Sequence, residues 1–505
     1  MEDIKKKTTK KKKSSFIYQL IVFIALIITV ITLGYLTYTG IFSLFYLVPA
    51  AVVLVIVLFW MAIKVGKRIT PTWVKVLLCL ISILLSIVEI FIMNYGTKTE
   101  EFIFKILDDG KRVTTYNVYV LSDSDYKELN DLNGKKITYL NSDDDTEIRE
   151  ALGKVESEIE ITDDYLDSLD ELLQSLTDNK TDAIFFESSY EDIIREEFKD
   201  SYDNLESIYS VKIEDQIKTL KSNKDISKDT FTVYISGVDT AGKKISSKAR
   251  SDVNILLTIN PKTSQITMIS TPRDSYVMLH TKQKNDKLTH AGIYGIEESV
   301  KTLEDLYDIE IDYYARVNFS SFISIVNTLG GVTIDVPKSF CEQNSKRSKK
   351  QEDLICLKKG KRTLNGEQAL AYARNRHNFS GGDFARGDHQ MELLKAIINK
   401  CMTPTILGKY TKLLESLGDK VTTNMGKDDI TKFINKVLMS GKGFTFETYG
   451  LEGTLGREVC ASTGKSKLSV VKLKEESINT AKGKIKNTYD GIKQEETTTT
   501  TTKRK

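Results

Sequence analysis

Residues 250–274 read RSDVNILLTINPKTSQITMISTPRD, and this stretch decides the fold of the largest part of the chain. It contains two short apolar runs rich in β-branched residues, Val253–Ile259 and Ile266–Ile269, which predict two buried strands. Asn260-Pro261 supplies a turn between the two runs. We therefore expect an antiparallel hairpin in the interior of a sheet.

Charged residues lie at both outer ends of this predicted hairpin. Arg250 and Asp252 lie at the start of the first strand, and Arg273 and Asp274 follow the second. If the strands pair, the four side chains meet at one edge of the sheet. On this stretch alone, solvated salt bridges are the simpler interpretation, and a functional cluster is the alternative.

The length and charge of the chain indicate several parts of different character. Its 505 residues predict two or three domains. The formal net charge of +3 conceals a lysine-rich head and an acidic stretch over residues 143–203. No pair of cysteines has the spacing of a structural zinc site.

Three apolar runs near the N-terminus are long enough to span a bilayer as helices, Phe16–Tyr38, Ile41–Ile63 and Trp73–Met93. Cations flank the first run and the loop after the second, whereas the loop between the first two runs is uncharged. This bias predicts a cytoplasmic N-terminus and an extracellular position for everything after Asn94. We expect a multi-pass protein of the cell membrane with three spans.

The chain is predicted to be an α/β protein in five segments. We expect a cytoplasmic basic head at 1–15, three transmembrane helices at 16–95, an extracellular accessory α/β domain at 96–228, a catalytic domain at 229–475 and a disordered tail at 476–505. In the accessory domain we predict strands at Val113–Leu121, Lys136–Leu140 and Asp182–Glu187, and a helix at Tyr165–Leu176. In the catalytic domain we predict helices at Ala291–Tyr307, Ser320–Leu329, Asn365–Ala373 and Phe384–Lys400, which would cover both faces of a sheet.

Four cysteines follow the apolar runs, and an extracellular position would permit disulfides between them. Cys341 with Cys356 would close a short polar loop, which leaves Cys401 with Cys460. The sequence does not decide this connectivity.

Polar residues with chemical potential gather in three further places in the same domain. Asp239 ends the first strand, in GVDT, and DKLTHAG carries Lys287, His290 and Gly292. The densest group is ARNRHNFSGGDFARGDHQ, residues 373–390. It contains these charged or polar candidates: Arg374, Arg376, Asp383, Arg386 and Gln390.

These residue types suit a phosphorylated ligand. Arginine presents a planar fork that matches phosphate oxygens, and Asp239 with Asp252 would supply the oxygen ligands that Mg²⁺ prefers. Several cations with a metal ion meet the needs of phosphoryl transfer. The alternative is a set of ion pairs that hold helices to the sheet. A nucleic-acid partner is not expected, because this domain is predicted to lie outside the cell.

Six phrases in order, RSD, TPRD, DKLTHAG, LGGVTIDVP, LNGEQALAYARNR and D-x-x-R-x-x-x-Q, resemble the LytR-CpsA-Psr family of cell-wall ligases. The resemblance covers roughly residues 230–471, and the membrane and accessory segments resemble the capsule-associated branch. It implies an α/β/α sandwich that binds a polyprenyl-diphosphate-linked glycan. It also implies a phosphotransferase that moves a capsule or teichoic acid type glycopolymer onto peptidoglycan and releases polyprenyl phosphate.

The resemblance also implies roles for individual residues. Asp239 and Asp252 would hold Mg²⁺ (or Mn²⁺). The residues that would bind the diphosphate are Arg250, Arg273, Lys287, Arg374, Arg376, Arg386 and Gln390. The residues with a catalytic role would be Asp252, Arg273, Arg374 and Asp383, of which Asp383 would orient the arginines or assist proton transfer.

Two positions depart from the family pattern. Many members have arginine where this chain has Ala241 and His389. His389 would restore part of a phosphate contact when protonated, and an ordinary solvated histidine is the simpler interpretation.

Two other functions fit the same sequence. A membrane-anchored binding or regulatory module would sense lipid-linked cell-wall intermediates without turning them over. A transcription regulator is suggested only by the lysine-rich head. Release of polyprenyl phosphate would distinguish an enzyme from a binding or regulatory module. An extracellular position of the domain would exclude a transcription regulator.

Overall fold

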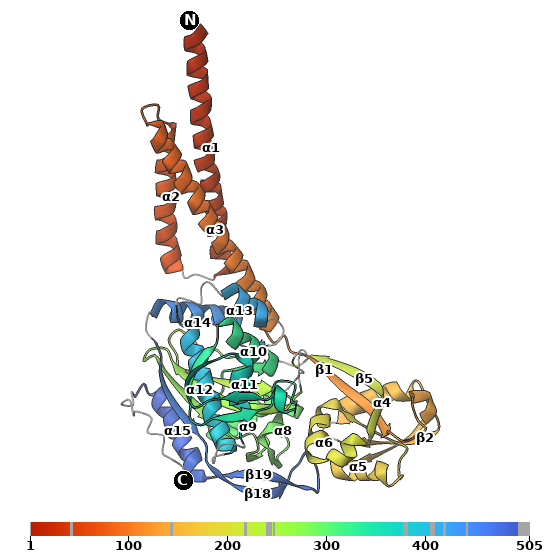
Figure 1. Ribbon diagram of the computed structural model, residues 1–505. Helices are drawn as coiled ribbons and strands as arrows, with labels where there is room; N and C mark the ends of the chain where they lie inside the picture. Colours follow the sequence, from red (N-terminus) through yellow and green to blue (C-terminus); the bar gives the residue numbers. More distant parts are fainter. Residues whose placement is uncertain are drawn as a thin grey trace. The chain divides into compact units, whose positions relative to one another are not determined.

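The computed structural model of the protein describes residues 2–40, 44–141, 145–216, 220–238, 245, 248–348, 350–376, 382–403, 410–417, 421–440 and 443–492. Contacts divide the chain into two compact units (Figure 1). The first contains residues 1–105, 410–415 and 426–441, and the second contains the remainder. Residues 106–228 of the predicted accessory domain lie in the second unit, as does the predicted catalytic domain apart from residues 410–415 and 426–441.

Long helices dominate the first unit: α1 (Glu2–Thr39), α2 (Leu44–Gly66) and α3 (Thr72–Ile106). The apolar segments Phe16–Thr39, Leu47–Gly66 and Thr72–Ile106 are long and apolar enough to cross a membrane. This agrees with the three predicted spans. Two shorter helices complete this part of the chain, α13 (Tyr410–Leu417) and α14 (Lys427–Ser440).

A five-stranded sheet in the order β3-β2-β4-β1-β5 forms the first part of the second unit. The strands are β1 (Lys111–Leu121), β2 (Lys135–Leu140), β3 (Ile161–Leu166), β4 (Ala183–Glu187) and β5 (Leu205–Gln216). The helices between them are α4 (Asp145–Glu156), α5 (Leu169–Thr177), α6 (Glu191–Glu197) and α7 (Lys199–Asp203). The helix predicted from Tyr165 begins only at Leu169, because Tyr165 and Leu166 pair in register with β2.

A six-stranded sheet in the order β16-β11-β6-β7-β8-β17 forms the rest of this unit's centre. Its strands are β6 (Phe231–Val238), β7 (Ser251–Asn260), β8 (Gln265–Ser270), β11 (Tyr313–Asn318), β16 (Val421–Thr423) and β17 (Thr445–Gly450). The predicted hairpin is β7–β8, antiparallel, with Leu256 opposite Ile269. Asn260 Oδ1 accepts hydrogen bonds from the backbone N–H groups of Lys262 and Thr263 at 3.0 and 3.2 Å, which fixes the turn.

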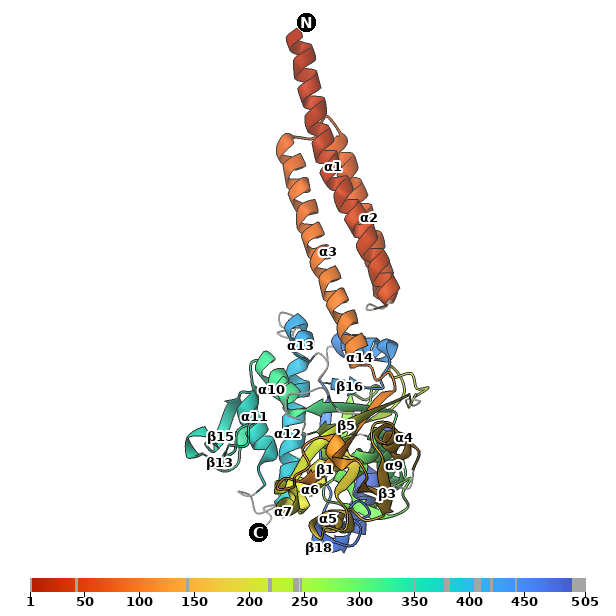
Figure 2. The ribbon, with the colours of Figure 1, turned by 90° about the vertical axis from the view of Figure 1, so that its right-hand side faces the viewer.

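Helices cover both faces of this sheet, and α9 lies on the opposite side from α10 and α11 (Figure 2). The helices of this part are α8 (Leu288–Ala291), α9 (Ile296–Tyr307), α10 (Phe319–Thr328), α11 (Gly366–Arg374), α12 (Asp383–Cys401) and α15 (Glu475–Tyr489). Strand alternation in β8 explains the two layers. Ile269 packs in one core with α9 and α15, whereas Ser270 faces Gly387 of α12. The α/β class and the sandwich are thus confirmed.

Four two-stranded ribbons complete the described part of this unit. They pair β9 (Tyr276–Met278) with β10 (Asn285–Lys287), β12 (Val332–Val336) with β15 (Gly360–Leu364), β13 (Phe340–Glu342) with β14 (Ile355–Leu357), and β18 (Gly453–Val459) with β19 (Lys467–Leu473).

Two predictions about this part of the chain were wrong. The helix expected over Ala291–Tyr307 begins at Ile296, because Gly295 has a φ of 115° and interrupts it. The tail predicted to be disordered from residue 476 instead forms α15 over Glu475–Tyr489. Ala481 and Ile485 of α15 are fully buried in the core that includes Leu256 and Ile269. Residues 493–505 of the predicted tail lie outside the described residues.

One disulfide joins Cys341 on β13 to Cys356 on β14 and closes the loop between these strands. The predicted partner pair, Cys401 with Cys460, does not form, and both thiols are free. Burial raises the pKa of both thiols, that of Cys401 to about 11, so they stay protonated near neutral pH.

Candidate functional site

A cavity of about 900 Å³ in the second unit brings most of the predicted site residues together. Seven of them line it: Arg250, Asp252, Arg273, Arg374, Arg376, Arg386 and Gln390. They come from segments of the chain that are far apart in sequence. The arginines expected to converge therefore do so.

The ends of the β7–β8 hairpin form one wall of the cavity. Arg273 Nη1 donates to Asp252 Oδ1 at 2.8 Å, so the two ends lie side by side as predicted. Gly292 positions this wall from behind, because the backbone N–H of Ala249 donates to the Gly292 carbonyl at 2.9 Å. A Cβ at Gly292 would lie only 2.3 Å from the Ala249 carbonyl oxygen, which explains the glycine in DKLTHAG.

Helices α11 and α12 supply the facing arginines. Arg374 is the last residue of α11, and its guanidinium lies 5.5 Å from the centre of the Phe319 ring. Asp383 begins α12, and its carboxylate lies 3.4 Å from Arg386 and 3.9 Å from Arg376. Asp383 does not line the cavity, so its geometry fits the positioning of two arginines.

Gln390 connects the two helices, because its Nε2 donates to the Ala373 carbonyl at 3.2 Å. This contact fixes the spacing between the end of α11 and the first turns of α12. Gln390 also lines the cavity. It thus combines a structural contact with a place in the wall of the predicted site.

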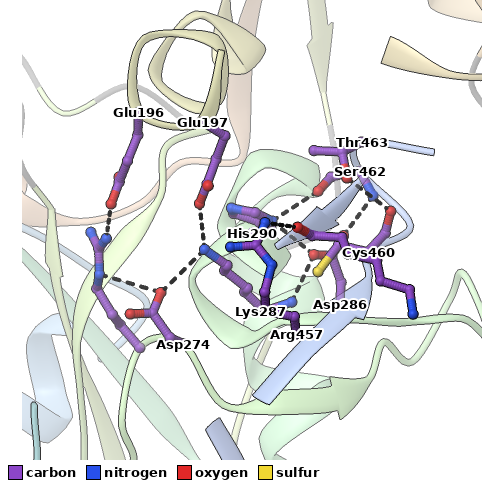
Figure 3. Close-up of polar contacts among 12 residues, drawn as sticks. Glu196, Glu197, Asp274, Asp286, Lys287, His290, Arg457, Cys460, Ser462 and Thr463 are labelled. Atoms are coloured by element: carbon purple, nitrogen blue, oxygen red, sulfur yellow. Dashed lines mark hydrogen bonds and ion pairs between the residues drawn. The ribbon is translucent and has the colours of Figure 1, made fainter. Parts of the chain in front are cut away.

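Lys287 lies beside the cavity without lining it. Its ammonium group forms an ion pair with Glu197 and lies 3.7 Å from Asp274 (Figure 3). The neighbouring Asp286 accepts a hydrogen bond from His290 Nδ1 at 2.7 Å and another from the backbone N–H of Ser462 at 2.6 Å. Because His290 and Asp286 are fully buried, this network anchors the Lys287 segment and offers no exposed nucleophile.

Burial and charge act in opposite directions on these groups. Burial alone would lower the pKa of Arg273, but the carboxylates of Asp252, Asp274 and Glu196 outweigh it and raise that pKa. Burial lowers the pKa of Arg374 and Arg386 from the usual arginine value. Nearby carboxylates therefore neutralise the positive charges of Arg374 and Arg386 only in part, and cations in this state attract an anionic ligand.

His389 does not replace a phosphate-binding arginine. Its side chain is buried and its ring centre lies 4.3 Å from that of Tyr372. Burial lowers the pKa of His389 to about 4, so it is neutral near pH 7. The expectations of a protonated phosphate contact and of a solvated histidine were both wrong.

Several residues that line the cavity were not predicted. Lys346 and Arg347 come from the loop closed by the Cys341–Cys356 disulfide. Glu196 of α6 comes from the part of the chain predicted as an accessory domain. The basic loop between two cysteines was a usable signal for the first two, whereas nothing in the local sequence of α6 indicates its role.

The predicted metal ligand Asp239 lies outside the described residues, as does Ala241. Its predicted partner Asp252 lines the cavity. Within the residues that the structure describes, no three His, Cys, Asp or Glu side chains form a metal-binding group. Asp252 is one of several carboxylates that line the cavity, and its oxygens are of the kind that Mg²⁺ prefers, so it suits a site shared with phosphate oxygens.

The fold and the cavity define a class of α/β proteins with apolar N-terminal helices and a cavity lined by several arginines. Residues 200–484 match the LytR_cpsA_psr family, and the chain belongs to this family. The comparisons thus confirm the resemblance noted in the sequence.

Curated relatives carry different names. The chain is 37% identical over 219 residues to the polyisoprenyl-teichoic acid–peptidoglycan teichoic acid transferase TagT of Bacillus subtilis. This match covers 43% of this chain and 66% of that protein. It is 30% identical over 318 residues to biofilm regulatory protein A of Streptococcus mutans, and this match covers 56% of this chain and 77% of that protein. The crystal structure of Bacillus subtilis TagV aligns with 52% of this chain and 98% of that chain, at 30% identity and a TM-score of 0.42. The match to TagT thus spans slightly less than two thirds of that relative.

Proposed function

We propose that this protein is a membrane-anchored phosphotransferase that moves an anionic glycopolymer, of capsule or teichoic acid type, from a polyprenyl diphosphate carrier onto peptidoglycan. The observation that carries the proposal is the convergence of five predicted arginines on one cavity of about 900 Å³. Family membership supports it, as does the name of the TagT relative, which describes the same kind of transfer.

The cavity suits the diphosphate for electrostatic reasons. Arg374 and Arg386 line it together with Arg273 and are removed from most solvent. In such a site each arginine fork can bind phosphate oxygens in pairs, and low solvent access strengthens the attraction. The same groups would stabilise charge that develops on the phosphoryl oxygens during transfer.

Apolar side chains suit the lipid on α10, which begins at the cavity residue Phe319, and on α12, which carries Arg386. Helix α10 is apolar, yet Phe322, Ile323 and Ile325 are only partly buried. Leu394 and Ile397 of α12 are also partly buried. Incompletely covered apolar surface of this kind commonly marks a ligand site. We propose that it contacts the polyprenyl chain.

The transfer step balances without an additional reactant. The acceptor hydroxyl oxygen of a peptidoglycan sugar forms a bond to the phosphorus next to the glycan. The bond from that phosphorus to the bridging oxygen breaks, and polyprenyl monophosphate leaves with the bonding electrons. The hydroxyl proton passes to a carboxylate of the cavity wall, and we assign this role to Asp252, one of the carboxylates that line the cavity. Asp383 keeps Arg376 and Arg386 in position.

A divalent cation, Mg²⁺ or Mn²⁺, is part of the proposal. Asp252 would bind it together with Asp239 and the diphosphate oxygens. When bound, the ion would neutralise charge on the diphosphate. Asp252 would remain hydrogen-bonded to Arg273, so this residue links the metal to the arginine cluster.

We also propose that the cavity lies outside the cell. The lysine-rich head and the cations after the second span favour a cytoplasmic N-terminus. The Cys341–Cys356 disulfide supports an oxidising compartment. A reporter fused after residue 94 that is active only outside the cell would agree with this orientation, and cytoplasmic activity would reject it.

The direct test is a transfer assay on the purified full-length protein in detergent, with lipid-linked glycan, a peptidoglycan acceptor and Mg²⁺. Removal of one charge-stabilising donor typically costs on the order of 10² to 10³ in rate, so we expect such a loss for Arg374→Ala and for Arg273→Ala. Arg362→Ala is the matched control, because Arg362 is exposed on β15 and does not line the cavity. Full activity in both cavity variants would reject the proposal.

The same assay tests the regulatory alternative, which the name of the Streptococcus mutans relative keeps open. If lipid-linked glycan binds but no polyprenyl phosphate is released, the protein is a binding module. Release of polyprenyl phosphate in proportion to glycan attachment would establish the enzyme.

A further inference from the structure

Helix α6 (Glu191–Glu197) ends in two consecutive carboxylates that contact the cations predicted to bind phosphate. Glu196 forms ion pairs with Arg250 and Arg273, one through each carboxylate oxygen. Glu197 forms an ion pair with Lys287 (Figure 3). Three predicted phosphate-binding cations are therefore paired with α6.

The cations in these contacts are well shielded from water. The side chains of Arg273 and Lys287 are 9% and 4% exposed, whereas those of Glu197 and Glu196 are 18% and 33% exposed. Ion pairs in such surroundings are stronger than surface pairs and costly to break on one side only. They are thus a substantial feature of the ligand-free protein.

The arrangement at Glu196 resembles that of a bound phosphate. Two anionic oxygens of one planar group contact two different guanidinium groups, as oxygens of a phosphate would. Burial would raise the pKa of Glu196, but Arg273 and Arg250 outweigh this effect and lower it. The carboxylate is therefore ionised at any physiological pH, and protonation does not remove its charge.

An anionic ligand would meet this charge directly. Glu196 lines the same cavity as Arg374, Arg376 and Arg386. A diphosphate bound by these arginines and Arg273 would lie against the Glu196 carboxylate, and like charges at such separations repel strongly. Both anions cannot occupy the contacts to Arg273 at once.

We propose that Glu196 occupies a phosphate position of the site in the free protein, and that Glu197 holds the end of α6 in place through Lys287, so that a diphosphate must displace this end of α6 in order to bind. This inference rests on the proposed function, because it takes the arginine cluster as a diphosphate site. It assigns to the accessory region an inhibitory contact that sets the affinity of the site.

The end of α6 is suited to such a displacement. Ile193 and Ile194 fix the middle of the helix in the core of the five-stranded sheet. The helix has only seven residues, and Phe198, with φ −129° and ψ 51°, separates it from α7. Glu196 and Glu197 lie in the last turn, where helices fray at low cost. Side-chain rotation and fraying of one turn suffice to release the three cations.

The test compares pyrophosphate binding by the detergent-solubilised full chain and by Glu196→Gln/Glu197→Gln, measured by calorimetric titration with Mg²⁺. Glutamine keeps the shape and helix propensity but removes the charge. We expect the double variant to bind inorganic pyrophosphate at least tenfold more tightly. Glu158→Gln/Glu206→Gln is the matched control, because it removes two carboxylates from exposed pairs in the same sheet domain. It should bind as the wild type does.

Equal or weaker binding by the cavity double variant would overturn the inference. A second readout guards against misfolding of the variant: in the wild type, pyrophosphate should increase hydrogen exchange of residues 191–203, and unchanged or slower exchange would also overturn it. The proposed function is checked separately with Arg374→Ala. If the wild type binds pyrophosphate, Arg374→Ala does not, and the glutamine variant gains nothing, only the inference fails. If neither the wild type nor the glutamine variant binds pyrophosphate, both fail.

Discussion

Replacing Gly292 with alanine should disturb the site from a position that does not contact the cavity. Gly292 has an ordinary φ of −67°, so the expected effect is steric and not conformational. The added Cβ would lie 2.3 Å from the carbonyl oxygen of Ala249, one residue before Arg250. Because carbon–oxygen contacts below 3.0 Å do not persist, the two segments must separate by at least about 0.7 Å.

This displacement predicts two magnitudes. Overpacking at a tight backbone contact costs about 1–3 kcal/mol of unfolding free energy. A misplacement approaching 1 Å can reduce catalysis by roughly a hundredfold, so we expect transfer to fall by about tenfold to a hundredfold. Calorimetric melting of the full chain and the transfer assay measure the two effects separately.

Gly153→Ala is the control for this experiment. Gly153 lies inside α4, and apart from its chain neighbours and the backbone of its own helix no atom lies within 4 Å of the Cβ that alanine would add. Alanine there should stabilise the protein by about 0.5–1 kcal/mol and leave transfer unchanged. If Gly292→Ala melts and transfers as the wild type does, the close packing of residues 249 and 292 does not position the arginines.

Three further predictions concern stability. The pKa of His389 is lowered to about 4 from about 6.5, so its neutral form stabilises the fold above pH 6.5. The unfolding free energy should fall by roughly 3 kcal/mol as the pH drops from 6.5 towards 4, and in denaturant titrations His389→Gln should reduce this fall. Cys341→Ser should lower stability by about 3 kcal/mol and weaken pyrophosphate binding, and a wild type unaffected by full reduction would contradict this. Ile485→Ala should cost about 2–5 kcal/mol, whereas Lys486→Ala should change melting little; equal effects would mean that α15 is not packed on the sheet.

Local sequence was sufficient for the elements that carry their own periodicity. The β7–β8 hairpin was predicted because β-branched runs and an Asn-Pro turn specify it without reference to other segments. Local sequence was not sufficient at α9, where the positive φ of Gly295 divides an otherwise helical pattern. Backbone conformation at a single glycine depends on the surrounding fold, and periodicity does not report it.

The C-terminal helix α15 was not predicted, because the Lys- and Thr-rich composition of the tail conceals the helical spacing of its buried residues. Ser477, Ala481, Ile485 and Thr488 recur at helical intervals and form its buried face. Only Ile485 among them is a large apolar side chain, so the face is inconspicuous in the sequence. The sheet supplies the apolar partner that makes the helix stable.

The site was predictable where its residues follow the ends of elements. Arg273 and Arg374 follow or end an element, and elements of one domain can be expected to present such ends to a common cavity. Glu196 and Glu197 were not predictable, because an acidic turn on a short helix resembles any solvated surface. Only the packing of the accessory region against the arginines reveals their contacts.

A crystal structure of the protein with a short polyprenyl diphosphate and Mg²⁺ would decide whether the arginine cavity holds the lipid-linked substrate. We expect density for the two phosphates between Arg273, Arg374 and Arg386, with the apolar tail against α10 and α12 and with Glu196 turned away from Arg273. Diphosphate bound elsewhere on the protein, with the Glu196 ion pairs intact and the cavity unchanged, would contradict the proposed function and the inference about α6 together.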